Sequence, residues 1–409
     1  MRVYQINVIC GSGSTGRIVV NLSQAIQMAG GECRIAYGRG TAPADIEAVK
    51  ISNSLDLYFH VLMTRITNRH GLYSKNATQK LIKDIINYNP DIIHLHNIHG
   101  YYVNYEILFK FLKDYKRPVI WTLHDCWAFT GRCAHYDSIG CDQWKYVCQH
   151  CINLKSYPSS WVEKNVYSNF VKKRECFNSI DRLILVTPSK WLKNQVQNSF
   201  LNQVKCVTIQ NGIDVEQFTP KQGNRVKRKL CPHQEKLILG VASIWTQNKG
   251  YDDFIHLRNL LDEKYILCMV GLSDKQIAEL PTGIIGVKRT ESIEELAEYY
   301  SAADVFLNLT YEDTFPTTNI EALACGTPVL TYKTGGSPEI LTEECGAIAL
   351  QGDLKAIAKY VVEWCERPKD TLRCVNRGRE YNKQQKNLEY IELYQECMKK
   401  KLEDSSKMI

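Results

Sequence analysis

Short runs of β-branched and aliphatic residues recur along this chain, and each is followed by a longer segment of helical period. Such alternation predicts right-handed βαβ units built around a parallel sheet. The pattern occurs twice, with one interruption between the two series. We expect the first series of strands at Val3 to Ile9, Cys33 to Ala36, Ile92 to Leu95, Val119 to Leu123, Leu183 to Val186 and Val207 to Ile209. We expect the second series at Leu237 to Val241, Ile266 to Val270, Val305 to Leu309 and Val329 to Thr331.

The interruption lies around residues 218–235, where Pro220, Gly223 and Pro232 accompany a cluster of basic residues. A chain of 409 residues exceeds what one hydrophobic core usually supports. We therefore predict an α/β protein with two Rossmann-like, doubly wound domains over residues 1–217 and 236–380, joined by a linker over 218–235. We expect a C-terminal helix and tail over 381–409 to return to the first domain. The two domains are expected to face each other across a cleft, since open α/β sheets bind ligands at the carboxyl ends of their strands.

The composition is that of an ordinary globular protein, with 44% hydrophobic and 23% charged residues. No stretch has the length and apolarity of a transmembrane segment or a signal peptide, so we expect a cytoplasmic protein. Its sixteen cysteines are then expected to be reduced thiols or metal ligands. The net charge of +7 suits a phosphorylated ligand, an anionic membrane surface or simply a solvated basic surface. No basic run with interleaved aromatic residues indicates nucleic-acid binding.

A glycine-rich segment follows the first expected strand: Gly11-Ser12-Gly13-Ser14-Thr15-Gly16-Arg17, a G-x-G-x-x-G sequence that opens a helix. Glycines let the backbone approach an anion, and the amides of a helix start face it. Alone, the motif favours a dinucleotide, so an NADP-dependent oxidoreductase is one alternative. Tyr37-Gly38-Arg39 stand where a ribose-binding carboxylate is expected. Arg39 keeps NADP open, and a tight turn explains the glycines equally well.

The stretch over residues 311–329 follows the expected strand Val305 to Leu309 and places two carboxylates around a helix start. Asp313 lies in the loop, the helix begins near Thr317 or Thr318, and Glu321 lies inside it before Gly326 ends it. Two acids with free amides between them suit a ligand that carries both hydroxyls and phosphate.

Asp313-x7-Glu321, followed by Ala-Leu-Ala-Cys-Gly-Thr-Pro-Val, resembles the E-x7-E signature of retaining glycosyltransferases of family 4, which have the GT-B fold. Residues 209–218 resemble the family's exit from the first domain, and Pro188-Ser189-Lys190-Trp191-Leu192 resembles another of its turns. Residues 89–97 and 121–127 are similar to members that act in colanic-acid, exopolysaccharide, capsule and O-antigen assembly. The resemblance covers nearly the whole chain in the family's order.

The resemblance implies a role for each matching position. Asp313 contacts the hydroxyls of the donor sugar, Glu321 contacts the nucleotide ribose, and Lys249 balances the charge of the leaving diphosphate. His124, which ends a strand of the first domain, faces the transferred sugar. The residues that offer backbone amides to the diphosphate are Phe315, Pro316, Thr317, Thr318 and Asn319.

Two positions depart from the family pattern. The first acid of the signature is the shorter Asp313, and Ser243-Ile244-Trp245 stands where the family has an arginine before Lys249. We expect Arg17, beside Gly13 and Gly16 of the glycine-rich loop, or Arg289 to supply the second cation to the donor.

The function implied is transfer of a hexosyl group, with retention, from a nucleoside-diphosphate sugar to a polyprenyl-diphosphate-linked saccharide in bacterial surface polysaccharide biosynthesis. No catalytic cofactor is expected. The acceptor implies peripheral contact with the inner face of the plasma membrane. A nonhydrolysing nucleotide-sugar epimerase and the NADP-dependent oxidoreductase are the alternatives.

The loop over residues 126–151 is rich in cysteine. Cys133, Cys141, Cys148 and Cys151 supply four soft ligands, although only the Cys148-x2-Cys151 pair has ideal zinc-knuckle spacing. A structural zinc ion and free buried thiols are both open interpretations. Four thiolates leave no open coordination position, which disfavours a catalytic metal.

The segment from Tyr105 to Arg117 combines aromatic, aliphatic and basic residues. Such a helix can lie at a membrane interface or be an ordinary βαβ crossover with its apolar stripe in the core. We favour the core.

Overall fold

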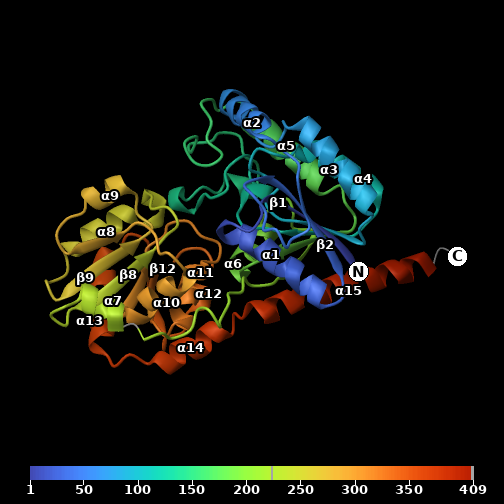
Figure 1. Ribbon diagram of the computed structural model, residues 1–409. Coiled ribbons are helices and arrows are strands. Elements are labelled where there is room, and N and C mark those ends of the chain that lie inside the picture. Colours follow the sequence, from blue (N-terminus) through green and yellow to red (C-terminus); the bar gives the residue numbers. More distant parts are fainter. Residues whose placement is uncertain (223, 407–409) are drawn as a thin grey trace. The chain divides into compact units, whose positions relative to one another are not determined.

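The computed structural model describes residues 1–222 and 224–406, and Gly223 of the expected linker lies outside them (Figure 1). The chain divides into two compact units. Unit 1 holds residues 1–210 together with the chain from Lys386, and unit 2 holds Asn211–Gln385.

Unit 1 is built on a seven-stranded sheet whose strand pairs are all parallel. The strand order is β3-β2-β1-β4-β5-β6-β7. The order reverses between β1 and β4, and this reversal is the switch point at which doubly wound sheets bind ligands. The strands are β1 (Arg2–Ile9), β2 (Glu32–Arg39), β3 (Ala48–Lys50), β4 (Ile92–Leu95), β5 (Val119–Thr122), β6 (Leu183–Thr187) and β7 (Lys205–Thr208).

Helices cover both faces of this sheet. One face packs against α3 (Lys75–Tyr88), α4 (Tyr105–Tyr115), α5 (Val166–Phe177) and α6 (Lys190–Gln197). The other packs against α1 (Gly13–Met28) and the C-terminal α15 (Lys383–Ser406). The apolar side chains of α4 are buried in the first of these cores, so the crossover interpretation is confirmed. A further helix, α2 (Ser54–Thr67), buries only His60 and Thr64.

The long connection between β5 and α5 carries the cysteine-rich loop. It contains three short 3₁₀ turns, η1 (Trp127–Phe129), η2 (Asp137–Ile139) and η3 (Gln143–Lys145). Trp127, Phe129 and Trp144 are buried in the core of unit 1, so the loop is packed against the sheet layer.

Unit 2 repeats the architecture with six parallel strands in the order β10-β9-β8-β11-β12-β13. The strands are β8 (Lys236–Val241), β9 (Tyr265–Val270), β10 (Ile284–Val287), β11 (Val305–Asn308), β12 (Val329–Tyr332) and β13 (Gly346–Ala349). One core lies under α7 (Asn224–Leu230), α10 (Ile293–Ala302), α11 (Thr317–Ala324), α12 (Ser337–Ile340) and α14 (Thr371–Arg379). The other lies under α8 (Tyr251–Arg258), α9 (Asp274–Ala278) and α13 (Leu354–Glu366).

The segment expected as a linker lies within unit 2. Its helix α7 buries Val226 and Leu230 in the core, and Lys227 forms an ion pair with Asp304. The unit is closed where the chain enters and leaves it, because Ile213 donates its amide hydrogen to Tyr381 O over 2.8 Å and Lys383 Nζ lies 2.7 Å from Asp214 Oδ2.

Two tyrosines attach α15 to the sheet of unit 1. The hydroxyl of Tyr394 lies 2.6 Å from His94 Nδ1, and that of Tyr390 lies 3.0 Å from Thr122 Oγ1. The second ring nitrogen of His94, Nε2, lies 2.8 Å from the same Thr122 hydroxyl. These side chains are buried, so each depends on its neighbours for hydrogen bonds.

We predict that Tyr394→Phe destabilises unit 1 by about 1–3 kcal/mol, because it leaves buried His94 Nδ1 without this partner. Tyr167→Phe is the matched control, since Tyr167 is exposed on α5 and should change stability by less than about 0.5 kcal/mol. Urea unfolding followed by tryptophan fluorescence measures both, because five of the seven tryptophans belong to unit 1. Equal stability of the two variants would contradict the role of this hydrogen bond.

Candidate active site

Lys249 and Asp313 meet in unit 2 at the carboxyl end of β11. Lys249 Nζ lies 2.9 Å from Asp313 Oδ2 and donates to the Glu312 carbonyl oxygen over 3.3 Å. Their side chains are 39% and 24% exposed, so both remain in reach of a ligand. The first acid of the signature, Asp313, and the predicted lysine, Lys249, are therefore in contact.

Gly250 allows this approach. Its φ is +77°, and a Cβ at this position would lie 2.3 Å from the carbonyl oxygen of Leu309, the residue after β11. Only glycine accommodates both conditions. The 3₁₀ turn η4 (Gln247–Lys249) therefore packs directly on the end of β11, where Tyr311 donates its amide hydrogen to Asn248 O.

The start of α11 lies beside this pair. Asp313 Oδ1 accepts a hydrogen bond from the amide of Phe315 at 3.2 Å. The N-cap residue is Pro316, whose side chain cannot cap the first-turn amides of the helix. Uncapped amides at a helix start carry a partial positive charge that suits phosphate oxygens. Thr317, Thr318 and Asn319 open this helix as expected, and Asn319 Oδ1 accepts from Asn308 Nδ2 at 2.7 Å.

Glu321, the second acid of the signature, is buried in α11. Its Oε2 accepts a hydrogen bond from the hydroxyl of Tyr300 at 3.0 Å. Tyr300 comes from α10, and no sequence motif pointed to it. It fixes the orientation of this carboxylate from a neighbouring helix.

The remaining residues predicted for the donor are divided between the two units. Arg289 is exposed in unit 2 after β10. Gly13, Gly16 and Arg17 belong to unit 1, where the amide of Gly11 donates to Gly16 O at 3.0 Å and closes the turn between β1 and α1. Arg17 is exposed at the start of α1. Their contribution to donor binding stays a prediction.

His124 follows β5 by two residues in unit 1 and is part of a chain of hydrogen bonds. Its Nε2 lies 3.1 Å from His96 Nδ1, and His96 Nε2 lies 3.1 Å from Gln5 Oε1. Gln5 Nε2 donates to Val19 O at 3.0 Å, which turns the carbonyl end of the amide toward His96. His96 must then carry its hydrogen on Nε2 and accept at Nδ1. His124 consequently donates from Nε2 and keeps a lone pair on Nδ1.

Desolvation lowers the pKa of His124 to about 4 and that of His96 well below its usual value. Both rings are therefore neutral near pH 7, as the hydrogen-bond chain requires. With a neutral ring, His124 is not a cationic acid.

Asp125, the residue after His124, forms a second polar pair in unit 1 with His99. Asp125 Oδ2 lies 2.8 Å from His99 Nε2, and Asp125 Oδ1 accepts from the amide of Trp127 at 2.9 Å. Burial alone raises the pKa of Asp125, but His99 and this amide outweigh burial and hold it at about 2. The sequence reasoning missed this pair, although both residues follow the carboxyl ends of strands.

Comparison with known proteins identifies the chemistry. Residues 223–381 match the family described as glycosyl transferases group 1, and residues 15–217 match glycosyltransferase family 4. The chain therefore belongs to the glycosyltransferases that these two models describe, one for each half of the chain. It is 24% identical over 370 residues to WcaC of Escherichia coli strain K12, covering 85% of this chain and 86% of WcaC, whose name places it as a glycosyl transferase of colanic acid biosynthesis.

Solved structures show the GT-B fold. Sucrose-phosphate synthase from Thermosynechococcus elongatus superposes with a TM-score of 0.71 at 17% identity, covering 97% of this chain and 98% of that chain. Anabaena Alr3699/HepE, solved in complex with UDP-glucose, superposes with a TM-score of 0.67 at 13% identity, covering 97% and 100%. The family match decides against the oxidoreductase and epimerase alternatives.

The four cysteines expected as zinc ligands all lie in the glycosyltransferase's β5–α5 loop. Cys133 and Cys148 are buried, Cys141 and Cys151 are half-buried, and all four are free thiols. As positioned in residues 1–222 and 224–406, no three His, Cys, Asp or Glu side chains are grouped to hold a metal ion. The zinc site stays a prediction.

We predict that Lys249→Gln lowers kcat/KM of the glycosyltransferase by about 10²–10³-fold, because it removes a cation placed against developing charge. Lys275→Gln is the matched control, since Lys275 is 83% exposed on α9 and should leave kcat/KM within about twofold. Initial rates over a donor concentration series measure both. Unchanged kcat/KM for Lys249→Gln would remove Lys249 from the site.

We also predict that His124 is protonated on Nε2 and neutral from pH 5 to 8. Long-range ¹H–¹⁵N NMR correlations of the ring distinguish a protonated Nε2 from an unprotonated Nδ1. Gln5→Leu removes the acceptor that orients His96 and should release this tautomer preference, while Gln27→Leu, an exposed change on α1, should not. A hydrogen on His124 Nδ1 in the unaltered protein would contradict the hydrogen-bond chain.

Proposed function

We propose that this glycosyltransferase transfers a hexosyl group from a nucleoside-diphosphate sugar, with retention, to a lipid-linked saccharide in bacterial surface polysaccharide biosynthesis. The observation that carries the donor assignment is the convergence of Lys249, Asp313 and the uncapped start of α11. Similarity to WcaC supports the polysaccharide assignment.

The Lys249–Asp313 pair suits donor binding because it is exchangeable. A partly exposed ion pair contributes only about 0–1 kcal/mol to stability, so a ligand displaces it at little cost. When a diphosphate binds, Lys249 turns to the phosphate oxygens, and Asp313 is released to accept hydrogen bonds from sugar hydroxyls. The amides of α11 add donors to the phosphate.

The way the carboxylates are held supports a route to retention that has no covalent glycosyl-enzyme intermediate. Asp313 is engaged by Lys249 and by the amide of Phe315, and Glu321 by Tyr300, so neither is placed as a nucleophile. We propose front-face attack: the bond between the anomeric carbon and the phosphate oxygen breaks while the acceptor oxygen bonds from the same face. The leaving phosphate takes the acceptor proton, and Lys249 stabilises the phosphate charge.

A membrane-bound acceptor is supported by the surface of α2. Its exposed residues Leu55, Tyr58, Phe59, Leu62 and Ile66 recur at the spacing of one helix face. A helix with an exposed apolar face can lie in a bilayer interface. Among the residues that the structure describes, no helix is long and apolar enough to span a membrane.

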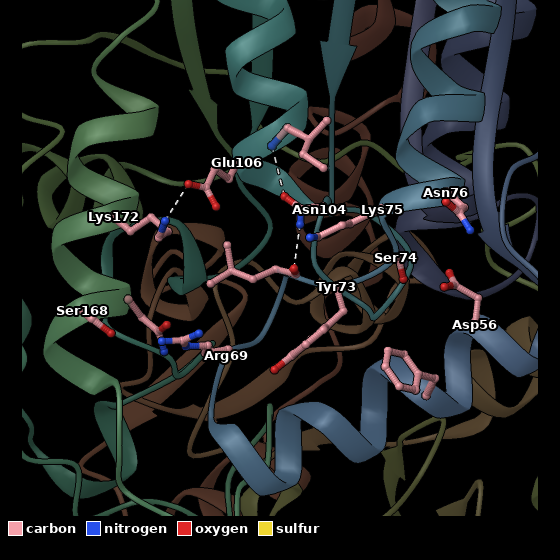
Figure 2. Close-up of a pocket in the computed structure, with 14 residues that line it drawn as sticks. Asp56, Arg69, Tyr73, Ser74, Lys75, Asn76, Asn104, Glu106, Ser168 and Lys172 are labelled. Atoms are coloured by element: carbon pink, nitrogen blue, oxygen red, sulfur yellow. Dashed lines mark hydrogen bonds and ion pairs between the residues drawn. The ribbon is translucent and has the colours of Figure 1, made fainter.

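A hollow of about 880 Å³ opens beside α2, at the starts of α3 and α4 (Figure 2). Phe59 and Asp56 of α2 line it together with Arg69, Tyr73 and Lys75. Arg69 and Lys75 are exposed and form no ion pair in the described part of the chain, whereas Lys172 is paired with Glu106 at 2.6 Å. Cations beside an apolar helix face match the anionic headgroups of a bilayer.

The donor assignment is tested by thermal stabilisation against a panel of nucleoside diphosphates and their sugars. One donor should raise the melting temperature with ligand concentration, and Lys249→Gln should abolish the shift while Lys275→Gln retains it. NMR of the product then reports the anomeric configuration. An inverted product would overturn the front-face mechanism and leave the donor assignment intact.

We predict that Phe59→Ser/Leu62→Ser weakens binding to vesicles that contain anionic phospholipid by at least about tenfold, because the apolar contact of α2 is lost. Leu350→Ser/Leu372→Ser is the matched control, since these leucines lie in unit 2 and are more exposed than Phe59 and Leu62. Vesicle cosedimentation measures both pairs. Equal binding of the two double variants would exclude α2 as the membrane contact.

A further inference from the structure

The cysteine-rich loop gathers four thiols that the transfer chemistry does not use. Cys148 Sγ accepts a hydrogen bond from the amide of Gly131 at 3.2 Å. Cys133 lies two residues after Gly131 in the sequence. Both are buried in one core cluster, and Cys141 and Cys151 pack against its edge. Cys133 lies within electrostatic range of Cys148 and Cys151, and Cys148 within range of Cys141.

Two cations are buried in the same place. Arg132 is 2% exposed and Lys173 is 1% exposed. Arg132 donates to Asn68 Oδ1 at 3.1 Å and to backbone carbonyls of residues 153–158, and its Nη1 lies 3.7 Å from Cys151 Sγ. Lys173 Nζ donates to Trp127 O at 2.7 Å and to Thr130 O at 3.1 Å.

These cations have no anionic partner among the described residues. Neither forms an ion pair, and each lies within electrostatic range of the other and of the thiols. Asp125 is the carboxylate that acts on Lys173, and it is already paired with His99 at 2.8 Å. A buried charge without a counter-charge is costly even when its hydrogen bonds are satisfied.

We propose that Cys133, Cys141, Cys148 and Cys151 bind one structural Zn²⁺, and that the resulting anionic centre is the counter-charge for Arg132 and Lys173. Binding releases four thiol protons to solvent, and Zn²⁺ with four thiolates carries a net charge of −2. This charge neutralises the two buried cations. With neutral thiols Arg132 has no counter-charge, and desolvation lowers the pKa of Lys173 to about 7, so its ammonium group is only partly protonated near neutral pH.

The thiols are neighbours but are not grouped around an ion as they stand, so the proposed binding draws them together. The loop permits this movement, because Cys141 and Cys151 lie at the edge of the core and their side chains are half-buried. A centre with four thiolates has no open position for substrate, so its role is structural. It fixes the loop that supplies the Trp127 amide to Asp125.

The test is the metal content of the full chain, purified without chelator from cells grown with added zinc. We expect about one zinc per chain by elemental analysis. We expect titration of the unaltered protein with a mercurial reagent to release it as the loop thiols react. Cys148→Ser and Cys151→Ser should each lose most of the metal. Cys206→Ser, which changes a half-buried thiol on β7, should retain it.

The counter-charge is tested separately by Lys173→Met, which keeps the length of the side chain without its charge. It should weaken zinc affinity by about 10–100-fold in competition with a chelating dye. Zinc below about one-tenth per chain in the unaltered protein, or a Cys148–Cys151 disulfide in its place, would overturn the proposal. Release of zinc by mercurial titration decides the question without any variant, and it does not depend on which sugar is transferred.

Discussion

The approach of η4 to the end of β11 is the constraint on which the proposed donor site depends. Gly250 makes it possible, because any other residue would place a Cβ against the Leu309 carbonyl. The consequence is that Lys249 reaches Asp313 across a gap of 64 residues in sequence. Asp313 is itself held by the amide of Phe315, so the same contact sets the entry to α11. The three parts of the site are thus positioned by one backbone contact.

The first unit positions His124 in a different way, through a chain of buried hydrogen bonds. Its starting point is Gln5, whose amide is fixed by Val19 O and thereby decides the tautomer of His96. A buried polar side chain in the middle of β1 costs desolvation unless every group is paired. The cost is offset here because each member of the chain of bonds is paired, from Gln5 to His124 just after β5. A β-branched residue at position 5 would pack as well but would leave the tautomer of His124 undetermined.

The sequence predicted both sheets and the second-domain site because these depend on local patterns. Strand runs such as Ile266 to Val270 are apolar on both faces, and the signature from Asp313 to Gly326 combines a loop, a helix start and a helix stop within a few residues. The expected linker over 218–235 shows the limit of such patterns. Pro220 and Pro232 mark turns, but burial of Val226 against the core of unit 2 depends on residues far along the chain. Tyr300 and His96 were missed for the same reason, since their roles come from neighbours that no local spacing reveals.

The face of α2 was missed because its apolar spacing is that of an ordinary core helix, and only exposure distinguishes the two. The segment from Tyr105 to Arg117 has a similar pattern and is buried.

Exposure also separates the two classes of lysine in this protein. Lys249 is 39% exposed, so water screens its pair with Asp313 and a ligand can break it. Lys173 is 1% exposed, and desolvation lowers its pKa to about 7, so a charged Lys173 is favoured only beside a fixed counter-charge. The same ammonium group is therefore suited to ligand exchange at one depth, whereas at the other we propose a fixed anionic centre beside it.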